Sequence, residues 1–139
     1  SKALICLVDS DARLQRYVRH VPSVAWELID ATTDKPTTLI LDHAVNLAPN
    51  LISEDGSVGI RITHEPFSHE LCYRMQRAIV STSANISGMP AAQNYCDLAP
   101  ELLEAVDYVC ASRRQEHKPH KPSSIIKLTA DGIVTVIRK

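Results

Sequence analysis

The chain has 139 residues, 45% of them hydrophobic, and a formal net charge of −1. That length is enough for one domain whose hydrophobic core needs no metal or disulfide. That charge argues against a protein that binds nucleic acid mainly through bulk positive charge, and it leaves a local basic patch open. No apolar run reaches the roughly 20 residues of a membrane-spanning helix, and the four cysteines include no C-x-x-C pair, so we expect no membrane contact and reduced thiols in the cytoplasm.

The first half of the sequence alternates signals for strands and helices. Short apolar runs predict buried strands, and Asp, Ser or Pro ahead of a helically periodic segment predicts a helix start. The expected elements are, in chain order, a strand at residues 3–8, a helix from Asp9 or Ser10 to about His20, a short helix opened by Pro22, and strands at 37–42 and 57–62.

The second half ends in a predicted β-hairpin, because two β-rich segments flank an Asp-Gly turn. The expected elements are a helix at 66–75, a strand at 78–81, a helix at 94–106, a short strand at 107–111, a polar loop at 113–122, and hairpin strands at 123–129 and 132–138. Alternating helices and strands that end in a hairpin predict an α/β fold with an open mixed sheet flanked by helices.

Residues 80–90, VSTSANISGMP, gather small, hydroxyl and amide side chains directly after an apolar strand. In open α/β sheets, ligands bind beyond the carboxyl ends of strands, and small residues let a ligand approach the backbone there. Gly88 supports a turn that presents successive N–H groups to an anion. The composition equally fits a capped turn ahead of the next helix, so an anion-binding loop and a structural turn both remain open.

Arg61 lies within the apolar strand segment SVGIRI, where a guanidinium group requires an anion. Either a ligand carboxylate or a structural salt bridge would satisfy this requirement.

Five segments together resemble a known family. STSANISGMP is similar to the S-T-S-A-N-x-S-G-x-P signature of the YrdC/TsaC family, the threonylcarbamoyl-AMP synthases. In matching order, SVGIRI resembles T-V-G-[IV]-R-[IV]-P, KPSSIIKL resembles x-P-S-T-[IV]-[IV]-D-L, VTVIRK resembles [IV]-x-R-x-G, and SKAL resembles the end of K-x-R-x-x-[SN]-K-P-L. These motifs span the whole sequence, so we expect a single YrdC-like domain over residues 1–139.

The resemblance also implies that this domain is incomplete at its N-terminus. Family members carry further strands and a K-x-R pair before the point at which this sequence starts, and the first apolar strand begins almost at residue 1. We therefore expect a C-terminal portion of the domain, with little activity by itself.

The activity that the resemblance implies is a nucleotidyl transfer in tRNA modification. L-Threonine and bicarbonate form a carbamate, which attacks the α-phosphate of ATP to give threonylcarbamoyl-AMP and pyrophosphate, with Mg²⁺ neutralising the triphosphate. Such a transfer depends on positioning and charge stabilisation, so no nucleophilic side chain and no protein-bound metal is expected. The implied partners are a tRNA threonylcarbamoyl transferase and, as a further option, tRNA or double-stranded RNA.

The resemblance assigns roles to eight residues. The implied ATP-binding residues are Lys2, Ser57, Asn85, Gln93 and Arg138, and the implied threonine-binding residues are Arg61, Ser83 and Ser123. If residues 83–85 are extended, alternation places Ser83 and Asn85 on one face, as a shared ligand requires. Each polar residue also has a structural alternative, such as an exposed end-of-strand cation for Arg138.

Several positions depart from the family pattern. The departures are Thr63 for proline, Ser124 for threonine, Lys127 for aspartate, AAQN after Pro90, and TTDKPTTLIL in place of W-P-G-P-L-T-L-V-L. None of them removes a chemical group to which the resemblance gives a role.

Two alternatives to the synthase remain. One is an RNA-binding paralogue described as a putative translation factor, although retention of S-A-N favours the enzyme. The other is a structural remnant that self-associates through an exposed first strand.

Overall fold

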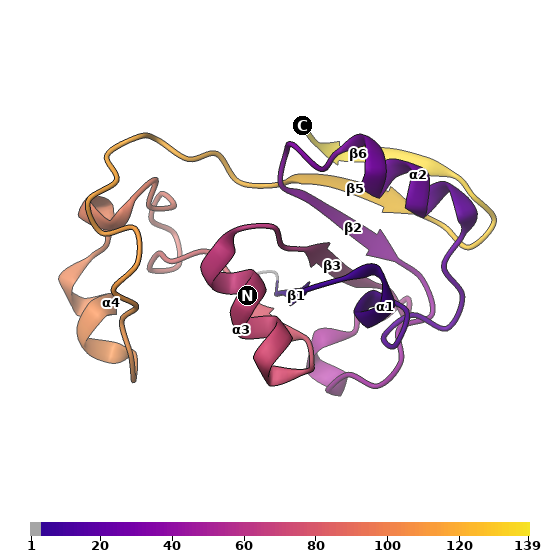
Figure 1. The fold of residues 1–139 in the computed structure, drawn as a ribbon, viewed down its shortest axis with the longest axis horizontal. Coiled ribbons are helices and arrows are strands. Elements are labelled where there is room, and N and C mark those ends of the chain that lie inside the picture. The colour runs from indigo at the N-terminus through magenta and orange to yellow at the C-terminus, as the bar shows by residue number, and fades with distance from the viewer. Residues whose placement is uncertain (1–3) are drawn as a thin grey trace. The chain divides into compact units, whose positions relative to one another are not determined.

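The computed structural model describes residues 4–139 and forms two compact units (Figure 1). The larger unit contains residues 4–81 and 123–139, and the smaller unit contains residues 82–122. The larger unit holds the whole sheet and the hydrophobic core.

A six-stranded mixed sheet forms the larger unit, with strand order β4-β1-β3-β2-β5-β6. The strands are β1 (Ile5–Val8), β2 (Thr37–Leu41), β3 (Val58–Ile62), β4 (Ile79–Ser81), β5 (Ser124–Leu128) and β6 (Val134–Arg138). The pairs β1–β3 and β2–β5 are parallel, and the other neighbouring pairs are antiparallel. This confirms the predicted α/β fold with an open mixed sheet. The closing hairpin is also confirmed, with Gly132 at φ 89° in its turn.

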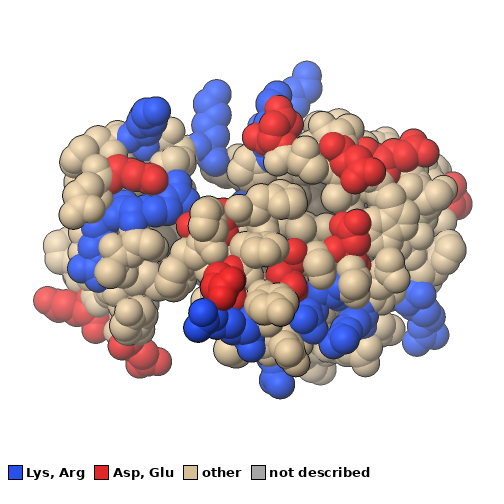
Figure 2. Space-filling view, in the orientation of Figure 1, with Lys and Arg blue, Asp and Glu red and all other residues tan. Residues whose placement is uncertain are grey.

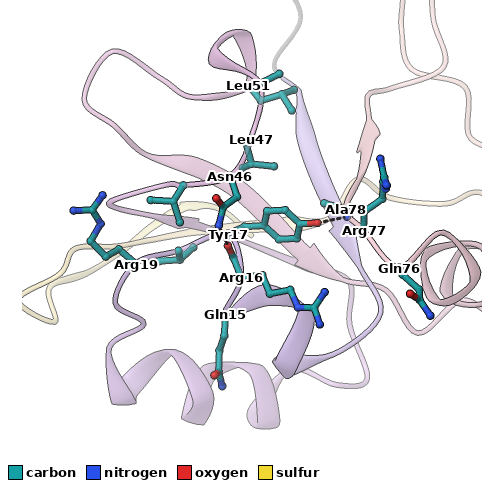
Figure 3. Close-up of a pocket in the computed structure, with 13 residues that line it drawn as sticks. Gln15, Arg16, Tyr17, Arg19, Asn46, Leu47, Leu51, Gln76, Arg77 and Ala78 are labelled. Carbon is teal, nitrogen blue, oxygen red and sulfur yellow. Dashed lines mark hydrogen bonds between the residues drawn. The ribbon is translucent and has the colours of Figure 1, made fainter.

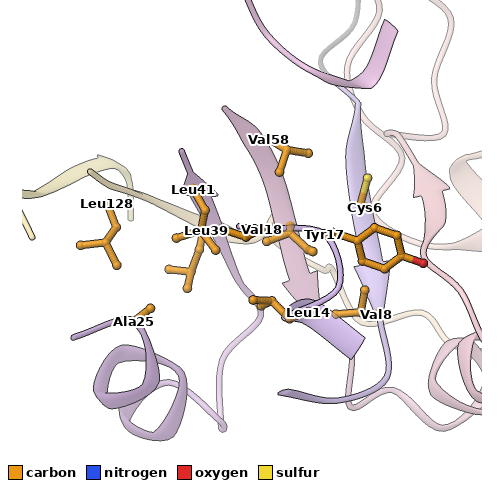
Figure 4. Close-up of a cluster of buried hydrophobic side chains, with 11 residues drawn as sticks. Cys6, Val8, Leu14, Tyr17, Val18, Ala25, Leu39, Leu41, Val58 and Leu128 are labelled. Carbon is orange, nitrogen blue, oxygen red and sulfur yellow. The ribbon is translucent and has the colours of Figure 1, made fainter. Parts of the chain in front are cut away.

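One face of the sheet carries the core (Figure 4). Helices α1 (Asp11–Leu14) and α2 (Ser23–Ala31) cover this face. Side chains alternate along a strand, so the residues that meet the helices are every second residue of β1, β2, β3 and β5. They include Cys6, Val8, Leu39, Leu41, Val58, Ile60 and Leu128. Trp26 lies partly buried against this cluster.

Helix α1 ends at Leu14, so the prediction of a helix to about His20 is wrong. Ser10 caps the start as expected, because its side chain accepts a hydrogen bond from the Arg13 N–H. After Leu14 the chain joins another segment instead of continuing the helix: Val18 forms a β-bridge with Ala44, and the Val45 N–H donates to the Tyr17 carbonyl. These long-range bonds take up backbone groups that a helix would have used.

The edges of the sheet are β4 and β6. The first strand, β1, lies between β4 and β3, so the expectation that it is an exposed edge is wrong. All five residues of β6 are exposed.

The 3₁₀ turn η1 (Pro49–Leu51), which was not predicted, follows β2. Helix α3 (Pro66–Met75) follows β3, as predicted. The predicted helix at 94–106 is wrong in its middle. It divides into the 3₁₀ turn η2 (Tyr95–Asp97), capped by Asn94, and helix α4 (Pro100–Ala105). Pro100 disfavours helical backbone at the preceding residue, and Ala99 is accordingly extended.

The short strand predicted at 107–111 does not form. The Arg114 guanidinium group forms hydrogen bonds with two backbone carbonyls of this segment: Nη2 donates to the Val109 oxygen at 2.7 Å and Nε to the Cys110 oxygen at 2.8 Å. In the part of the chain that the structure describes, no helix is long and apolar enough to cross a membrane.

The burial of Leu41 and the exposure of Val136 predict that substitutions at these two positions differ in their effect on the free energy of unfolding. Leu41 is fully buried, whereas Val136 in β6 is 55% exposed. Leu41→Ala is expected to lower the free energy of unfolding by about 2–5 kcal/mol because it leaves a cavity. Val136→Ala is expected to lower it by less than about 1 kcal/mol. Urea denaturation measures both, and equal losses would contradict this assignment of the core.

Candidate functional site

Arg61 lies on the sheet face opposite the core. Its neighbours in β3, Ile60 and Ile62, pack with the core cluster, so alternation directs Arg61 to the other face. The β2–β3 register pairs Leu39 with Ile60, and continuing it by one residue places Thr38 opposite Arg61. Gly59 lies on the same face, and a Cβ there would be 3.2 Å from Ile5 Cγ2, so the side chains of the neighbouring strands already close in beside Arg61.

The Arg61 side chain has no partner within residues 4–139. Its Nε atom is buried without a hydrogen bond, and no carboxylate forms an ion pair with its guanidinium group. Desolvation by burial lowers the pKa of Arg61 below its ordinary value. The structural salt bridge that was the alternative is therefore absent from the described part of the chain, and an anion placed here would offset the cost of desolvation.

Ser123 and Arg138 are hydrogen-bonded to each other. Arg138 donates through Nε at 2.9 Å and Nη2 at 2.6 Å to the Ser123 carbonyl. The Ser123 hydroxyl lies 2.8 Å from that of Thr38, which is 1% exposed. Because Thr38 is opposite Arg61 in the register, these contacts bring Ser123 and Arg138 to the face that carries Arg61.

The Asp55 carboxylate links Ser57 to Lys127, which lies on the same face of the sheet. Its hydroxyl donates to Asp55 Oδ1 at 2.6 Å, and its N–H donates to the same oxygen at 3.0 Å. The other oxygen of Asp55 accepts from Lys127 Nζ at 3.4 Å. Lys127 pairs with Ile40 in the β2–β5 register, which assigns it to the face of Arg61. The Ser57 hydroxyl group thus already donates to Asp55, so it can only accept a further hydrogen bond.

The remaining site residues predicted in the smaller unit lie in loops. Ser83 and Asn85 follow the end of β4, and the chain bends at Ala84 and Asn85, so the predicted alternation along an extended segment does not apply. Asn85 Nδ2 donates to the Met89 carbonyl at 2.7 Å, and the Met89 N–H donates to the Ile86 carbonyl at 2.9 Å. Gly88, at φ 86°, occupies the third position of this turn, as type II turns require.

Gln93 lies in the same unit, where its N–H donates to Asp97 Oδ2 at 3.2 Å and its carbonyl accepts from the His120 N–H at 3.2 Å. Lys2 lies outside the described residues. The structure therefore brings four of the eight predicted residues, Ser57, Arg61, Ser123 and Arg138, to one face of the sheet, and it holds three others in the smaller unit.

Local contacts occupy the arginines of the polar loop at 113–122. Arg113 forms an ion pair with Glu116 at 2.9 Å, and this pairing holds the pKa of Glu116 below its ordinary value. Arg114 lies 5.3 Å from the centre of the Tyr95 ring. Within residues 4–139, no group of three or more His, Cys, Asp or Glu side chains could hold a metal ion.

Thr38, Asp55 and Lys127 were not among the predicted site residues. Thr38 and Asp55 each contact one that was, and Lys127 contacts Asp55, but Thr38 and Ser123 are 85 residues apart in sequence. No local pattern could reveal that contact, whereas the short spacing between Asp55 and Ser57 could have indicated theirs.

Comparison with known proteins identifies relatives over most of the chain. The Sua5/YciO/YrdC family model, described as "Telomere recombination", matches residues 1–139. A Methanocaldococcus jannaschii protein named "Putative threonylcarbamoyl-AMP synthase" is 33% identical over 132 residues, covering 95% of this chain and 59% of that protein. A "Threonylcarbamoyl-AMP synthase" from Stenotrophomonas maltophilia is 31% identical and covers 76% of this chain and 58% of its own length. The chain thus spans less than two thirds of these relatives.

Solved structures share the fold. A double variant of P. abyssi Sua5 matches with a TM-score of 0.80 at 23% identity, over 97% of this chain and 40% of that one. E. coli YciO matches at 0.72 and 19% identity, over 98% of this chain and 65% of that one. P. abyssi Sua5 complexed with L-threonine matches at 0.68 and 22% identity, over 91% and 37%. These likenesses support the α/β fold with an open mixed sheet.

The Ser57–Asp55 contact has a measurable effect on titration. Hydrogen bonds from Ser57 are the main cause that lowers the pKa of Asp55, and Lys127 contributes less. Because the folded-state pKa is depressed, this contact stabilises the fold above the ordinary pKa of Asp55 and loses that effect as the pH falls through the folded value. Ser57→Ala is expected to raise the pKa of Asp55, and Lys127→Gln to raise it less, as measured by ¹³C NMR of the carboxyl carbon. An unchanged titration in Ser57→Ala would show that the contact is absent in solution.

Proposed function

The chain belongs to the Sua5/YciO/YrdC family, and from this premise we propose that it binds substrates for a threonylcarbamoyl-AMP synthase, a nucleotidyltransferase of tRNA modification. The substrates in this proposal are L-threonine, bicarbonate and ATP, with Mg²⁺ entering as part of the nucleotide substrate. Two findings support it: curated relatives are named for this activity, and a solved structure of the same fold is complexed with L-threonine.

The buried Arg61 side chain, which has no partner among the described residues, is the observation on which the proposal mainly rests. A buried guanidinium nitrogen without a partner, in the middle of an apolar strand, needs an anion. The carboxylate of L-threonine supplies one and can form two parallel hydrogen bonds with an arginine. Ser123 then approaches the polar groups of the same amino acid, since its contact with Thr38 brings it to the face of Arg61. Ser83 is assigned to threonine on the resemblance of its motif.

The nucleotide is assigned to Ser57, Asn85, Gln93, Arg138 and Lys2. The Ser57 hydroxyl group donates a hydrogen bond to Asp55, so it would accept a hydrogen bond from a nucleotide hydroxyl. Arg138 is exposed and would exchange its bond to the Ser123 carbonyl for a phosphate oxygen. Asn85 is assigned to the nucleotide on the resemblance of its motif, and its amide nitrogen donates to the Met89 carbonyl of the same turn.

The chemistry requires placement rather than a nucleophilic side chain. A carbamate oxygen of N-carboxythreonine attacks the α-phosphorus of ATP, the new P–O bond gives threonylcarbamoyl-AMP, and the bond to the β-phosphate breaks to release pyrophosphate. Arg61 would fix the amino acid by its carboxylate, and cationic side chains would stabilise charge on the phosphates. The product would pass to a tRNA threonylcarbamoyl transferase in the cytoplasm.

An activity assay tests this proposal. The chain is joined at its N-terminus to the preceding segment of the M. jannaschii relative, of which the chain spans 59%, and pyrophosphate release is measured with MgATP and bicarbonate, with and without L-threonine. Release is expected to depend on threonine. Arg61→Gln is expected to raise KM for threonine about 30-fold or more, because it removes one partner of a desolvated ion pair, while KM for ATP changes little.

Arg74→Gln is the matched control, since it removes a guanidinium group that is 77% exposed. If Arg61→Gln affects threonine no more than this control does, Arg61 does not bind the carboxylate. If release never depends on threonine, the synthase proposal fails.

A further inference from the structure

A second candidate binding site lies in the larger unit, built from loops that the proposed reaction does not use (Figure 3). An open pocket of about 730 Å³ forms where three loops meet, at residues 15–19, 45–48 and 76–78, and Leu51 of η1 completes it. This volume falls within the range of small-molecule sites, about 300–1,000 Å³.

The charged residues that line the pocket are all arginines. Arg16, Arg19 and Arg77 line the pocket, and no Asp or Glu does. None of the three forms an ion pair within residues 4–139. On the face that Figure 2 shows, red and blue side chains are interspersed, and the whole chain has 15 cationic and 16 acidic residues. Three unpaired arginines without a carboxylate therefore form a local site of anion attraction.

Tyr17 joins the loops into one frame. Its phenol oxygen accepts a hydrogen bond from the Ala78 N–H at 2.8 Å, and its carbonyl accepts from the Val45 N–H at 2.9 Å. Tyr17 is 8% exposed, and the phenol proton has no acceptor among the described residues, so it remains available as a donor.

Two residues with left-handed backbone complete the frame. Asn46 has φ 60° and donates from Nδ2 to the Arg16 carbonyl at 2.8 Å. Gln76 has φ 53°, and its carbonyl accepts from Arg13 Nη1 at 2.8 Å. Such conformations are uncommon outside glycine and persist where surrounding contacts fix them. The pocket is therefore held by specific bonds between distant segments before any ligand arrives.

The floor of the pocket is apolar. Val18 belongs to the core cluster, and Leu47 and Leu51 pack against it while they line the pocket. Figure 3 shows the guanidinium groups of Arg19 and Arg77 on opposite sides of the Tyr17 ring, with that of Arg16 below the ring. Because the three groups diverge, they suit separated or multiple anionic groups around an apolar body better than a single small ion.

We propose that this pocket binds a nucleotide, with phosphate oxygens on Arg16, Arg19 and Arg77 and the base against Leu47 and Leu51. Arginine matches the geometry of phosphate with paired N–H donors, and an aromatic base supplies the apolar body. The nucleotide is either a free one or a unit of an RNA strand. This site is separate from Arg61 and does not depend on the proposed synthase activity.

The test compares two triple variants of equal charge. Arg16→Gln, Arg19→Gln and Arg77→Gln empty the pocket of cations, while Lys35→Gln, Lys118→Gln and Lys121→Gln remove three exposed cations elsewhere. Binding of a short fluorescein-labelled oligoadenylate RNA is followed by fluorescence anisotropy over a series of salt concentrations. The pocket variant is expected to bind about tenfold or more weakly, and its slope of log K against log salt to fall by about 2, from three lost phosphate contacts. The control is expected to change affinity by less than about twofold.

Unlabelled AMP then separates the two sources of nucleotide. Displacement of the RNA by AMP assigns the pocket to a free nucleotide, and failure to displace it assigns the pocket to an RNA strand; both results support the site. The proposal is overturned if the unaltered chain binds neither probe, if both triple variants lose equal affinity, or if Arg138→Gln, at the proposed synthase site, abolishes binding. All substituted side chains are exposed, so equal urea midpoints verify that the variants fold.

Discussion

The alternation of side chains across the sheet determines where polar groups can lie in this protein. Helices α1 and α2 bury one face, so every second residue of the central strands must be apolar. The intervening residues include Thr38, Gly59 and Arg61, and the charged Arg61 guanidinium group cannot be accommodated in that core without a partner. A shift of the β3 register by one residue would bury the Arg61 guanidinium group against Leu39 and Leu41, at a large cost in desolvation. The same alternation that specifies the fold therefore presents Arg61 to the opposite face.

Hydrogen bonds then gather residues from distant parts of the sequence at that face. The Thr38–Ser123 contact joins β2 to the residue before β5, and the bond from Arg138 to the Ser123 carbonyl ties the end of β6 to the same point. Ser57 is fixed through Asp55 and Lys127. Most of these polar groups have partners within the chain. Arg61 has none among the described residues, and on this difference we base the proposal that it binds a ligand.

Much of the fold could be predicted from local sequence patterns, because β2, β3, α3 and the closing hairpin each carry their own periodicity or turn signal. The secondary-structure predictions failed where residues far apart in sequence form bonds with backbone N–H and carbonyl groups that the predicted element would have used. The β-bridge between Val18 and Ala44 ends α1 early, and Arg114 takes carbonyls that a strand at 107–111 would need. Pro100 was a local signal that should have divided the predicted helix at 94–106. In the site, the sequence singled out Arg61 as needing an anion, but it could not show that Thr38 contacts Ser123 or that three loops build a cationic pocket around Tyr17.

The central claim is that Arg61 binds a carboxylate, and the most direct measurement follows its own Nε–H group. In a ¹H–¹⁵N NMR titration of the 139-residue chain, the Arg61 Nε–H signal should shift with L-threonine and stay unchanged with L-threoninol, which lacks the carboxylate. Arg61→Lys assigns the signal by removing it. An Arg61 signal that does not move at saturating L-threonine, or that moves equally with both compounds, would contradict the account.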